Sequence, residues 1–280
     1  MKKDTKLHVR KSTGEMEPFT EDKVVNSLRR AGATEELINE ITGELHPVLH
    51  DGISTAKLYK QVYAMLRKKR AATAARYRLK KAIMDLGPTG YPFEFFVGEI
   101  IRRQGFEVKI GQVLDGHCVS HEVDVVATGK RKRYFIECKY YNSQGKYADV
   151  KVALYIHSRV NDLVARQRNL PGTEDFEFGG WIVTNTRFTT DAIAYGECSG
   201  LELLSWDYPE NGGLKDIAGK EKLYPVTALS TLNGKHKKLL LEERIVICQQ
   251  LHDRPQLLDP LELDPARRKK VIKEVAALCE

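Results

Sequence analysis

Three carboxylates and one lysine interrupt two apolar stretches that otherwise have the composition of buried β-strands. Glu122 and Asp124 lie in the first stretch, and Glu137 lies in the second, followed by Lys139 two positions later. Because side chains alternate along a strand, each polar pair shares a face, and a hairpin that turns at Gly129 can bring both pairs to the same side of the sheet. Carboxylates brought together repel, so one of them becomes protonated unless a cation lies between them.

This combination of residues predicts a site for a hard divalent cation. Mg²⁺, with Mn²⁺ as an alternative, is the natural ion for one or two carboxylates with room left for phosphate. A nearby lysine can orient or deprotonate a water molecule, or stabilise charge that develops on phosphorus. The hairpin therefore indicates metal-assisted hydrolysis of a phosphodiester. The alternative interpretation is a solvent-facing acidic hairpin with a cross-strand salt bridge.

The elements around this hairpin predict an α/β fold for residues 91–209. The order of apolar patterns is helix, three strands, helix, strand, helix and strand, which is typical of a mixed central sheet flanked by helices. The expected helices are 93–104, 148–169 and 190–198, and the expected strands are 106–113, 117–127, 133–141, 179–186 and 201–206.

Asp124 and the later Glu137-Cys138-Lys139 resemble the motif of the PD-(D/E)xK nuclease superfamily, and the surrounding segment resembles its Mrr-type restriction endonuclease domain. The resemblance extends to a helix that opens with Phe93-Glu94 and ends at Gly105-Phe106. It implies that Asp124, Glu137 and the backbone carbonyl of Cys138 bind the metal, that Lys139 is the catalytic lysine, and that Glu94 is an accessory acid.

Three features around this motif leave alternatives open. Glu99 competes with Glu94 for the accessory role but lies on a different face of the expected helix. His121 and Glu122 depart from the pattern of Mrr-type domains, which makes the subfamily and its substrate uncertain. On the helix after the second strand, several basic residues could contact phosphates or simply face solvent: Lys151, His157, Arg159, Arg166 and Arg168.

Residues 1–87 are expected to be mainly helical after a short extended start, with helices at 21–32, 35–42, 56–69 and 71–86. Their opening resembles an ATP-cone, the nucleotide-sensing module of ribonucleotide reductases and of their repressor. Five residues match the pattern, Ser12 replaces its usual arginine, and the preceding Arg10 can substitute for it; the matching residues are Val9, Lys11, Gly14, Phe19 and Lys23. The resemblance implies that ATP or dATP binds there, in a chain that has no Walker A motif. The alternative is a small helical DNA-binding domain.

Composition adds a weaker argument for a polyanionic partner. The net charge is +7, and residues 67–81 hold eight Lys/Arg and no acid, which favours DNA or a solvated helix face. Residues 210–280 are expected to form a helical extension, with clear helices at 239–251 and 264–279, and residues 86–92 are the best candidate for a linker.

The sequence therefore predicts a Mg²⁺-dependent DNA endonuclease regulated by ATP or dATP. A non-catalytic, nucleotide-responsive DNA-binding regulator and a structure-specific junction-resolving nuclease are the alternatives. No membrane span or signal peptide is expected, and five scattered cysteines fit the cytoplasm. A homodimer would be convenient for cutting both strands of a duplex.

Overall fold

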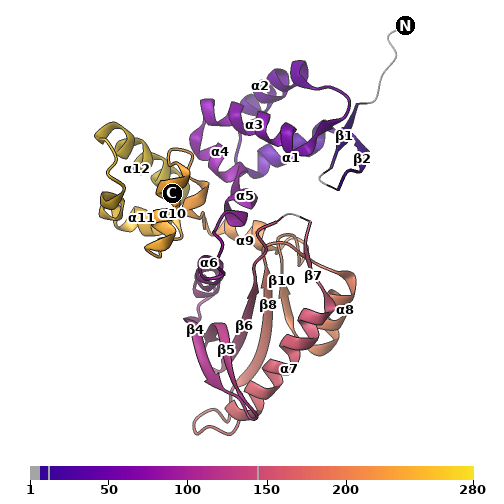
Figure 1. The fold of residues 1–280 in the computed structure, drawn as a ribbon, viewed down its shortest axis with the longest axis vertical. Coiled ribbons are helices and arrows are strands. Elements are labelled where there is room, and N and C mark those ends of the chain that lie inside the picture. Colours follow the sequence, from indigo (N-terminus) through magenta and orange to yellow (C-terminus); the bar gives the residue numbers. More distant parts are fainter. Residues whose placement is uncertain (1–6, 12, 144) are drawn as a thin grey trace.

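The computed structural model describes residues 7–11, 13–143 and 145–280. Within them the chain forms an N-terminal unit, a central unit built on a sheet, and a helical C-terminal unit (Figure 1). The mixed α/β architecture with helical flanking regions confirms the predicted fold class.

The N-terminal unit packs helices against a small sheet. β1 pairs antiparallel with β2 and parallel with β3, and Gly14 occupies the turn between β1 and β2 with a φ of +90°. Apolar side chains of α1, α2 and α3 form the core of this unit, including Leu28, Ile41 and Leu66. Its elements are β1 (His8–Arg10), β2 (Met16–Pro18), α1 (Glu21–Arg30), α2 (Glu35–Leu45), β3 (Ile53–Ser54), α3 (Thr55–Lys69), α4 (Ala71–Tyr77) and α5 (Leu79–Met84).

One expectation for this unit needs correction. The single helix expected over residues 71–86 is divided at Arg78 into α4 and α5. The division allows α5 to turn away from the helices of the N-terminal unit and pack against the rest of the chain.

The central unit is a sheet with the strand order β10-β8-β6-β5-β4 in the described residues. β4, β5 and β6 form an antiparallel meander, whereas β8 and β10 continue parallel to β6. A helix α6 covers one face, and α7 and α8 cover the other (Figure 1). The elements are α6 (Tyr91–Arg103), β4 (Glu107–Asp115), β5 (Ser120–Thr128), β6 (Lys132–Lys139), β7 (Tyr147–Ala148), α7 (Val150–Gln167), β8 (Glu177–Thr184), β9 (Arg187–Phe188), α8 (Thr190–Ser199) and β10 (Glu202–Leu204).

The C-terminal unit is helical, as expected, but the helix predicted over residues 239–251 is interrupted. Arg244 has a φ of +59°, and the chain then extends so that Ile247 bridges to Pro225. Two separate helices, α10 and α11, lie on either side of this break. The elements are α9 (Leu214–Lys220), α10 (Gly234–Glu242), α11 (Cys248–Asp253) and α12 (Pro265–Cys279), together with 3-10 turns at Val226–Ala228 and Pro255–Leu261.

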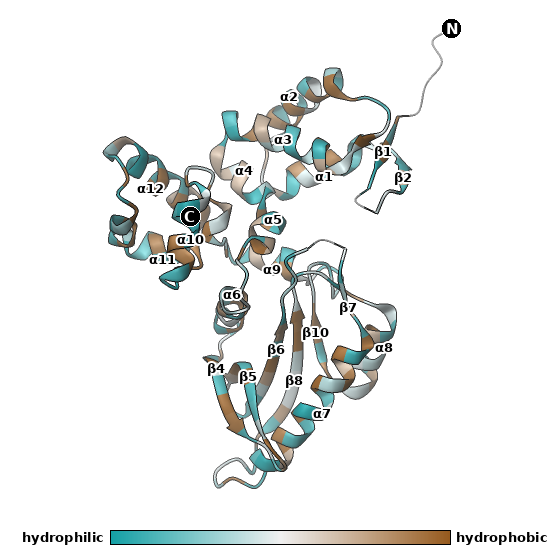
Figure 2. Cartoon of the chain, viewed as in Figure 1, coloured by the Kyte–Doolittle hydropathy of each residue, from teal (hydrophilic) through white to brown (hydrophobic). Residues whose placement is uncertain are grey.

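One apolar core joins the three units. It combines buried side chains of α5 and α6, one face of the central sheet, and the C-terminal helices. Leu86, in the stretch considered as a linker, is 0% exposed and belongs to this core. Figure 2 shows apolar residues along the central strands and a mixture of apolar and polar residues on α7. No helix among the described residues has the length and hydropathy needed to cross a bilayer.

A buried carboxylate organises the C-terminal unit. Glu274 on α12 is 3% exposed and accepts hydrogen bonds from the backbone N–H groups of Ser230 and Thr231 and from the Thr231 hydroxyl. We expect Glu274→Ala to lower the free energy of unfolding by about 3 kcal/mol, because it leaves buried donors without a partner. The matched control is Glu242→Ala, which removes an exposed ion pair with Lys238 and should cost less than about 0.5 kcal/mol. Equal effects in urea denaturation would contradict this account.

Candidate active site

The acids of the hairpin meet where the β5–β6 ladder ends. The last pair of this ladder joins Val125 to Ile136, so Asp124 and Glu137 are the next residues on the two strands. Instead of a further backbone pair, the Asp124 carboxylate accepts a hydrogen bond of 2.7 Å from the backbone N–H of Cys138. The strands therefore separate at Asp124 and Glu137, and the separation leaves their side chains accessible to each other.

Regular alternation, which the sequence analysis assumed, does not hold through Asp124. Val125 packs in the core on the α6 side of the sheet, whereas Val123 packs with α7 on the other side. Residues two apart on a regular strand share one face. On the neighbouring strand the residue opposite Asp124 is Gly111, which has a φ of +62°. This local distortion turns β5 so that Asp124 lies between α6 and Glu137.

Glu94 is the acid that α6 contributes to this site. Burial, followed by the negative charges of Asp124, Glu122 and Glu137, raises the pKa of Glu94 to about 7. Gly90 provides the space, because a Cβ there would lie 2.8 Å from the Glu94 carboxylate oxygen. Glu99, the competing candidate, instead pairs with Arg102 and Arg103. The structure thus brings Glu94 to the hairpin and directs Glu99 elsewhere.

Glu137 is held by two cations from different elements. Lys139 Nζ lies 2.5 Å from Glu137 Oε1, and Arg159 Nη1 lies 2.8 Å from Oε2. Arg159 comes from α7 and also donates to the backbone carbonyl of Glu122. From the sequence, Arg159 was expected either to contact phosphates or to face solvent. In the structure it points inward, and its side chain is only 15% exposed.

Asp124 and Glu94 have no such pairing with a cation among the described residues. Burial and the charge of Glu137 raise the pKa of Asp124 to about 6, against lowering effects of the Cys138 N–H, Lys139 and Arg159. When ionised, Asp124 and Glu94 therefore leave an excess of negative charge on their side of the site. A divalent cation would remove this excess.

His121, whose role the sequence left open, fixes the start of β5 to α7. Its Nε2 lies 2.7 Å from Asp162 Oδ2, and the same carboxylate accepts from the backbone N–H groups of Cys118 and Val119. The hydrogen bond from His121, together with these backbone bonds, holds the pKa of Asp162 well below its usual range. His121 thus positions the hairpin and does not extend the acidic cluster.

The oxygen donors of this site match what Mg²⁺ requires of a protein. In the described ranges no three His, Cys, Asp or Glu side chains stand close enough to enclose a metal. Mg²⁺ does not need such a cage, because it keeps several waters and is commonly held by one or two carboxylates and a phosphate. Asp124, Glu137 and the carbonyl of Cys138 are oxygen donors of this kind. The residues fit the ion.

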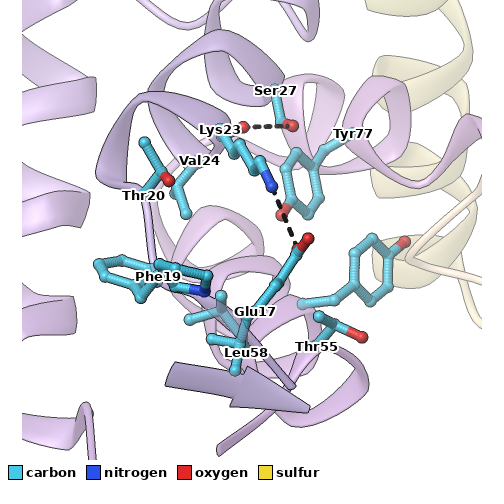
Figure 3. A pocket seen from close by; sticks show the side chains of 12 residues that line it. Glu17, Phe19, Thr20, Lys23, Val24, Ser27, Thr55, Leu58 and Tyr77 are labelled. Atoms are coloured by element: carbon cyan, nitrogen blue, oxygen red, sulfur yellow. Dashed lines mark hydrogen bonds and ion pairs between the residues drawn. The ribbon is translucent and has the colours of Figure 1, made fainter. Parts of the chain in front are cut away.

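The predicted nucleotide-binding residues are only partly gathered in one place. Val9, Phe19 and Lys23 line a cavity of about 160 Å³ in the N-terminal unit (Figure 3). Glu17 also lines it and pairs with Lys23 at 3.1 Å and with Lys11 at 3.0 Å. Lys11 itself lines an adjacent cleft, and the cavity does not include Arg10 or Gly14. Ser12 lies outside the described residues.

Comparisons with known proteins agree with this organisation. A family model described as ATP cone domain matches residues 7–83, the Mrr catalytic model described as Restriction endonuclease matches 88–208, and one described as AF1548-like, C-terminal matches 224–279. The fold and the site thus define an ATP-cone followed by an Mrr-type restriction endonuclease domain, as the resemblance predicted.

Individual relatives identify the family. An uncharacterized protein of Archaeoglobus fulgidus is 35% identical over 133 residues, which cover 48% of this chain and 71% of that protein. The crystal structure of a protein of unknown function, AF1548, matches with a TM-score of 0.55 and 30% identity, over 68% of this chain and 98% of that one. The chain belongs to the family of these proteins. The MspJI restriction endonuclease in complex with a 27-mer oligonucleotide matches at a TM-score of only 0.35 and 15% identity, over 71% of this chain and 41% of that one.

The raised pKa values predict how the metal-free protein responds to pH. The folded state binds protons on Asp124 and Glu94 more tightly than the unfolded state does. The contribution of these two groups to the free energy of unfolding is therefore fully present below about pH 4 and is lost as pH rises to about 7. Asp124→Asn removes one of the charges and should raise the melting temperature at pH 8 in EDTA by a few degrees. Glu99→Gln, the matched control, should not raise it. A lower melting temperature for Asp124→Asn would contradict the excess of negative charge.

Proposed function

We propose that this protein is a metal-dependent DNA endonuclease that hydrolyses phosphodiester bonds and is regulated by ATP or dATP bound to its cone. The observation that carries the proposal is the convergence of Glu94, Asp124 and Glu137 from three elements, with Lys139 on Glu137. A cluster of carboxylates that raises its own pKa values destabilises a fold unless it serves a ligand.

The residues divide the work of hydrolysis between them. Asp124, Glu137 and the Cys138 carbonyl would hold the cation, which supplies Lewis-acid polarisation of the phosphate and acidifies a bound water. Lys139, released from Glu137 when that carboxylate binds the ion, would orient the attacking water or stabilise the charge on phosphorus. Glu94, with its pKa near 7, can accept a proton from water at neutral pH. Arg159 keeps one oxygen of Glu137 oriented.

These groups carry no information about bases, so DNA specificity must come from other surfaces. The net charge of +7 supports a polyanionic substrate. Part of the positive charge of residues 67–81 is paired within the chain. Lys69 pairs with Glu40 and Glu44, and Arg78 and Lys81 both pair with Asp85.

Cleavage assays test the catalytic part of the proposal. We expect wild type to nick or cut DNA in Mg²⁺, and Asp124→Asn and Lys139→Met to lower the rate by roughly 10²–10³-fold, because each removes a group that acts on the transition state. Glu99→Gln should retain the wild-type rate. The substrates should include plain, methylated and branched duplexes, with gel-shift binding measured in parallel. Binding without cleavage by wild type on every substrate would overturn the nuclease assignment in favour of a regulator.

Nucleotide titrations test the regulatory part. Lys23→Ala should weaken ATP or dATP binding about tenfold, because it removes a cation from the cone cavity. Glu17→Gln should strengthen binding several-fold, because Glu17 now neutralises both Lys11 and Lys23 and must release them to an anion. Lys60→Ala, an exposed lysine on α3, serves as the control. Isothermal titration calorimetry that finds weaker binding in Glu17→Gln would contradict this competition.

A further inference from the structure

A second cleft lies where the cone meets the endonuclease domain. It has a volume of about 370 Å³ and is lined by Lys11, Thr55 and Lys80 from the cone and by Lys146 and Arg187 from the endonuclease domain. β7, which pairs with β9 outside the central sheet, lies at the end of the central unit that points toward the cone in Figure 1. Neither domain alone forms this cleft.

The charge of the cleft indicates an anionic ligand. Four cationic side chains line it, and Glu15, which pairs with Lys11 at 3.2 Å, is the carboxylate among its described lining residues. Arg187 is fixed in orientation by Asp207 at 2.9 Å. Burial lowers the pKa of Lys80, and the neighbouring positive charge of Arg187 lowers it further, so an anion here would relieve a repulsion.

The cone cavity and this cleft are adjacent. Thr55, the first residue of α3, lines both of them. The cavity of about 160 Å³ is small for a nucleoside triphosphate, since ligand pockets usually measure about 300–1,000 Å³. The remainder of such a ligand needs neighbouring space. The N-terminus of the 15-residue helix α3 at this point also favours a phosphate.

We propose that the phosphates of a nucleotide held in the cone extend into this cleft, where Lys146 and Arg187 of the endonuclease domain complete a site begun by Lys11 and Lys80. This inference rests on the nucleotide binding proposed above and adds the other domain as a direct participant. The ligand class is a nucleoside triphosphate, with its base end in the cone cavity and its phosphate end between the domains.

The same segment connects the cleft to the catalytic strand. Arg187 follows Thr184, whose hydroxyl donates to the carbonyl of Lys139 at 2.8 Å. Between them Asn185 accepts from the backbone N–H of Tyr141 at 2.9 Å and donates to its carbonyl at 2.8 Å. Phosphate bound by Arg187 would therefore act on a segment that is hydrogen-bonded to the end of β6. This gives nucleotide binding a physical route to Lys139.

Calorimetric titration of the full chain with ATP and with AMP tests the inference. Arg187→Gln and Lys146→Ala should each raise the Kd for ATP about tenfold and leave that for AMP within about twofold, because AMP lacks the outer phosphates. Arg187→Lys should recover part of the ATP affinity. Lys130→Ala, at the far turn of the β5–β6 hairpin, is the control and should behave as wild type.

The outcomes separate this inference from the proposal on which it rests. Normal ATP affinity in Arg187→Gln and Lys146→Ala, with weakened affinity in Lys23→Ala, would overturn the shared site and leave the cone as a nucleotide sensor. Equal loss of ATP and AMP binding in Arg187→Gln would mean that Arg187 supports the structure and does not bind the outer phosphates, which would also overturn the shared site. Failure of wild type to bind ATP would overturn both.

Discussion

The repulsion among Glu94, Asp124 and Glu137 is the constraint on which the site depends. Burial, together with the negative charge of neighbouring carboxylates, raises the pKa of Glu94 on α6 and of Asp124 on β5, and Glu137 on β6 is one of those neighbours in both cases. Such an arrangement costs stability in the absence of a counter-ion. The strand distortion at Asp124, opposite Gly111, is what brings the carboxylates together, since a regular β5 would have turned Asp124 with Val126 toward α7.

The protein compensates this repulsion unevenly. Glu137 pairs with Lys139 and Arg159, whereas the hydrogen bond that Asp124 accepts within the described part of the chain comes from the backbone N–H of Cys138. The uneven arrangement leaves negative charge at one side of the site and a lysine at the other. In the proposed nuclease, Glu137 would serve both as a metal ligand and as the partner of Lys139, so metal binding and the freeing of the lysine would be linked through this one carboxylate.

Local pattern was enough to predict the elements of the site but not its contacts. Asp124, Glu137 and Lys139 interrupt apolar strands, and Glu94 opens an amphipathic helix, so each was visible in a short window of sequence. Arg159 had the appearance of one more basic residue on a helix. Its inward direction depends on how α7 packs across the sheet, which no local pattern encodes. The same holds for His121, whose partner Asp162 lies 41 positions away.

Breaks in helices were also beyond local prediction, and for a related reason. The residues around Arg78 have good helical propensity, yet the helix divides there because α5 joins the core shared with α6 and the C-terminal unit. The basic stretch at residues 67–81 was expected either to contact DNA or to form a solvated helix face, and in the structure Lys69, Arg78 and Lys81 pair with carboxylates of the same chain. In both cases contacts with distant parts of the chain, and not the local sequence, determined the structure.

The shared core also determines how the cone can influence the sheet. Leu86 and α5 are buried together with α6, so the segment that connects the cone to the endonuclease domain is part of the packed core and is not a flexible linker. Thr227 of the C-terminal unit donates to the carbonyl of Ala82 on α5, and Arg76 on α4 donates to the carbonyl of Ala277 on α12. These hydrogen bonds hold the C-terminal unit against the cone. α6, the helix that bears Glu94, begins shortly after this buried connecting segment. A change in the cone that shifts α5 would therefore move the helix that supplies an acid to the site, whereas a flexible linker would have absorbed it.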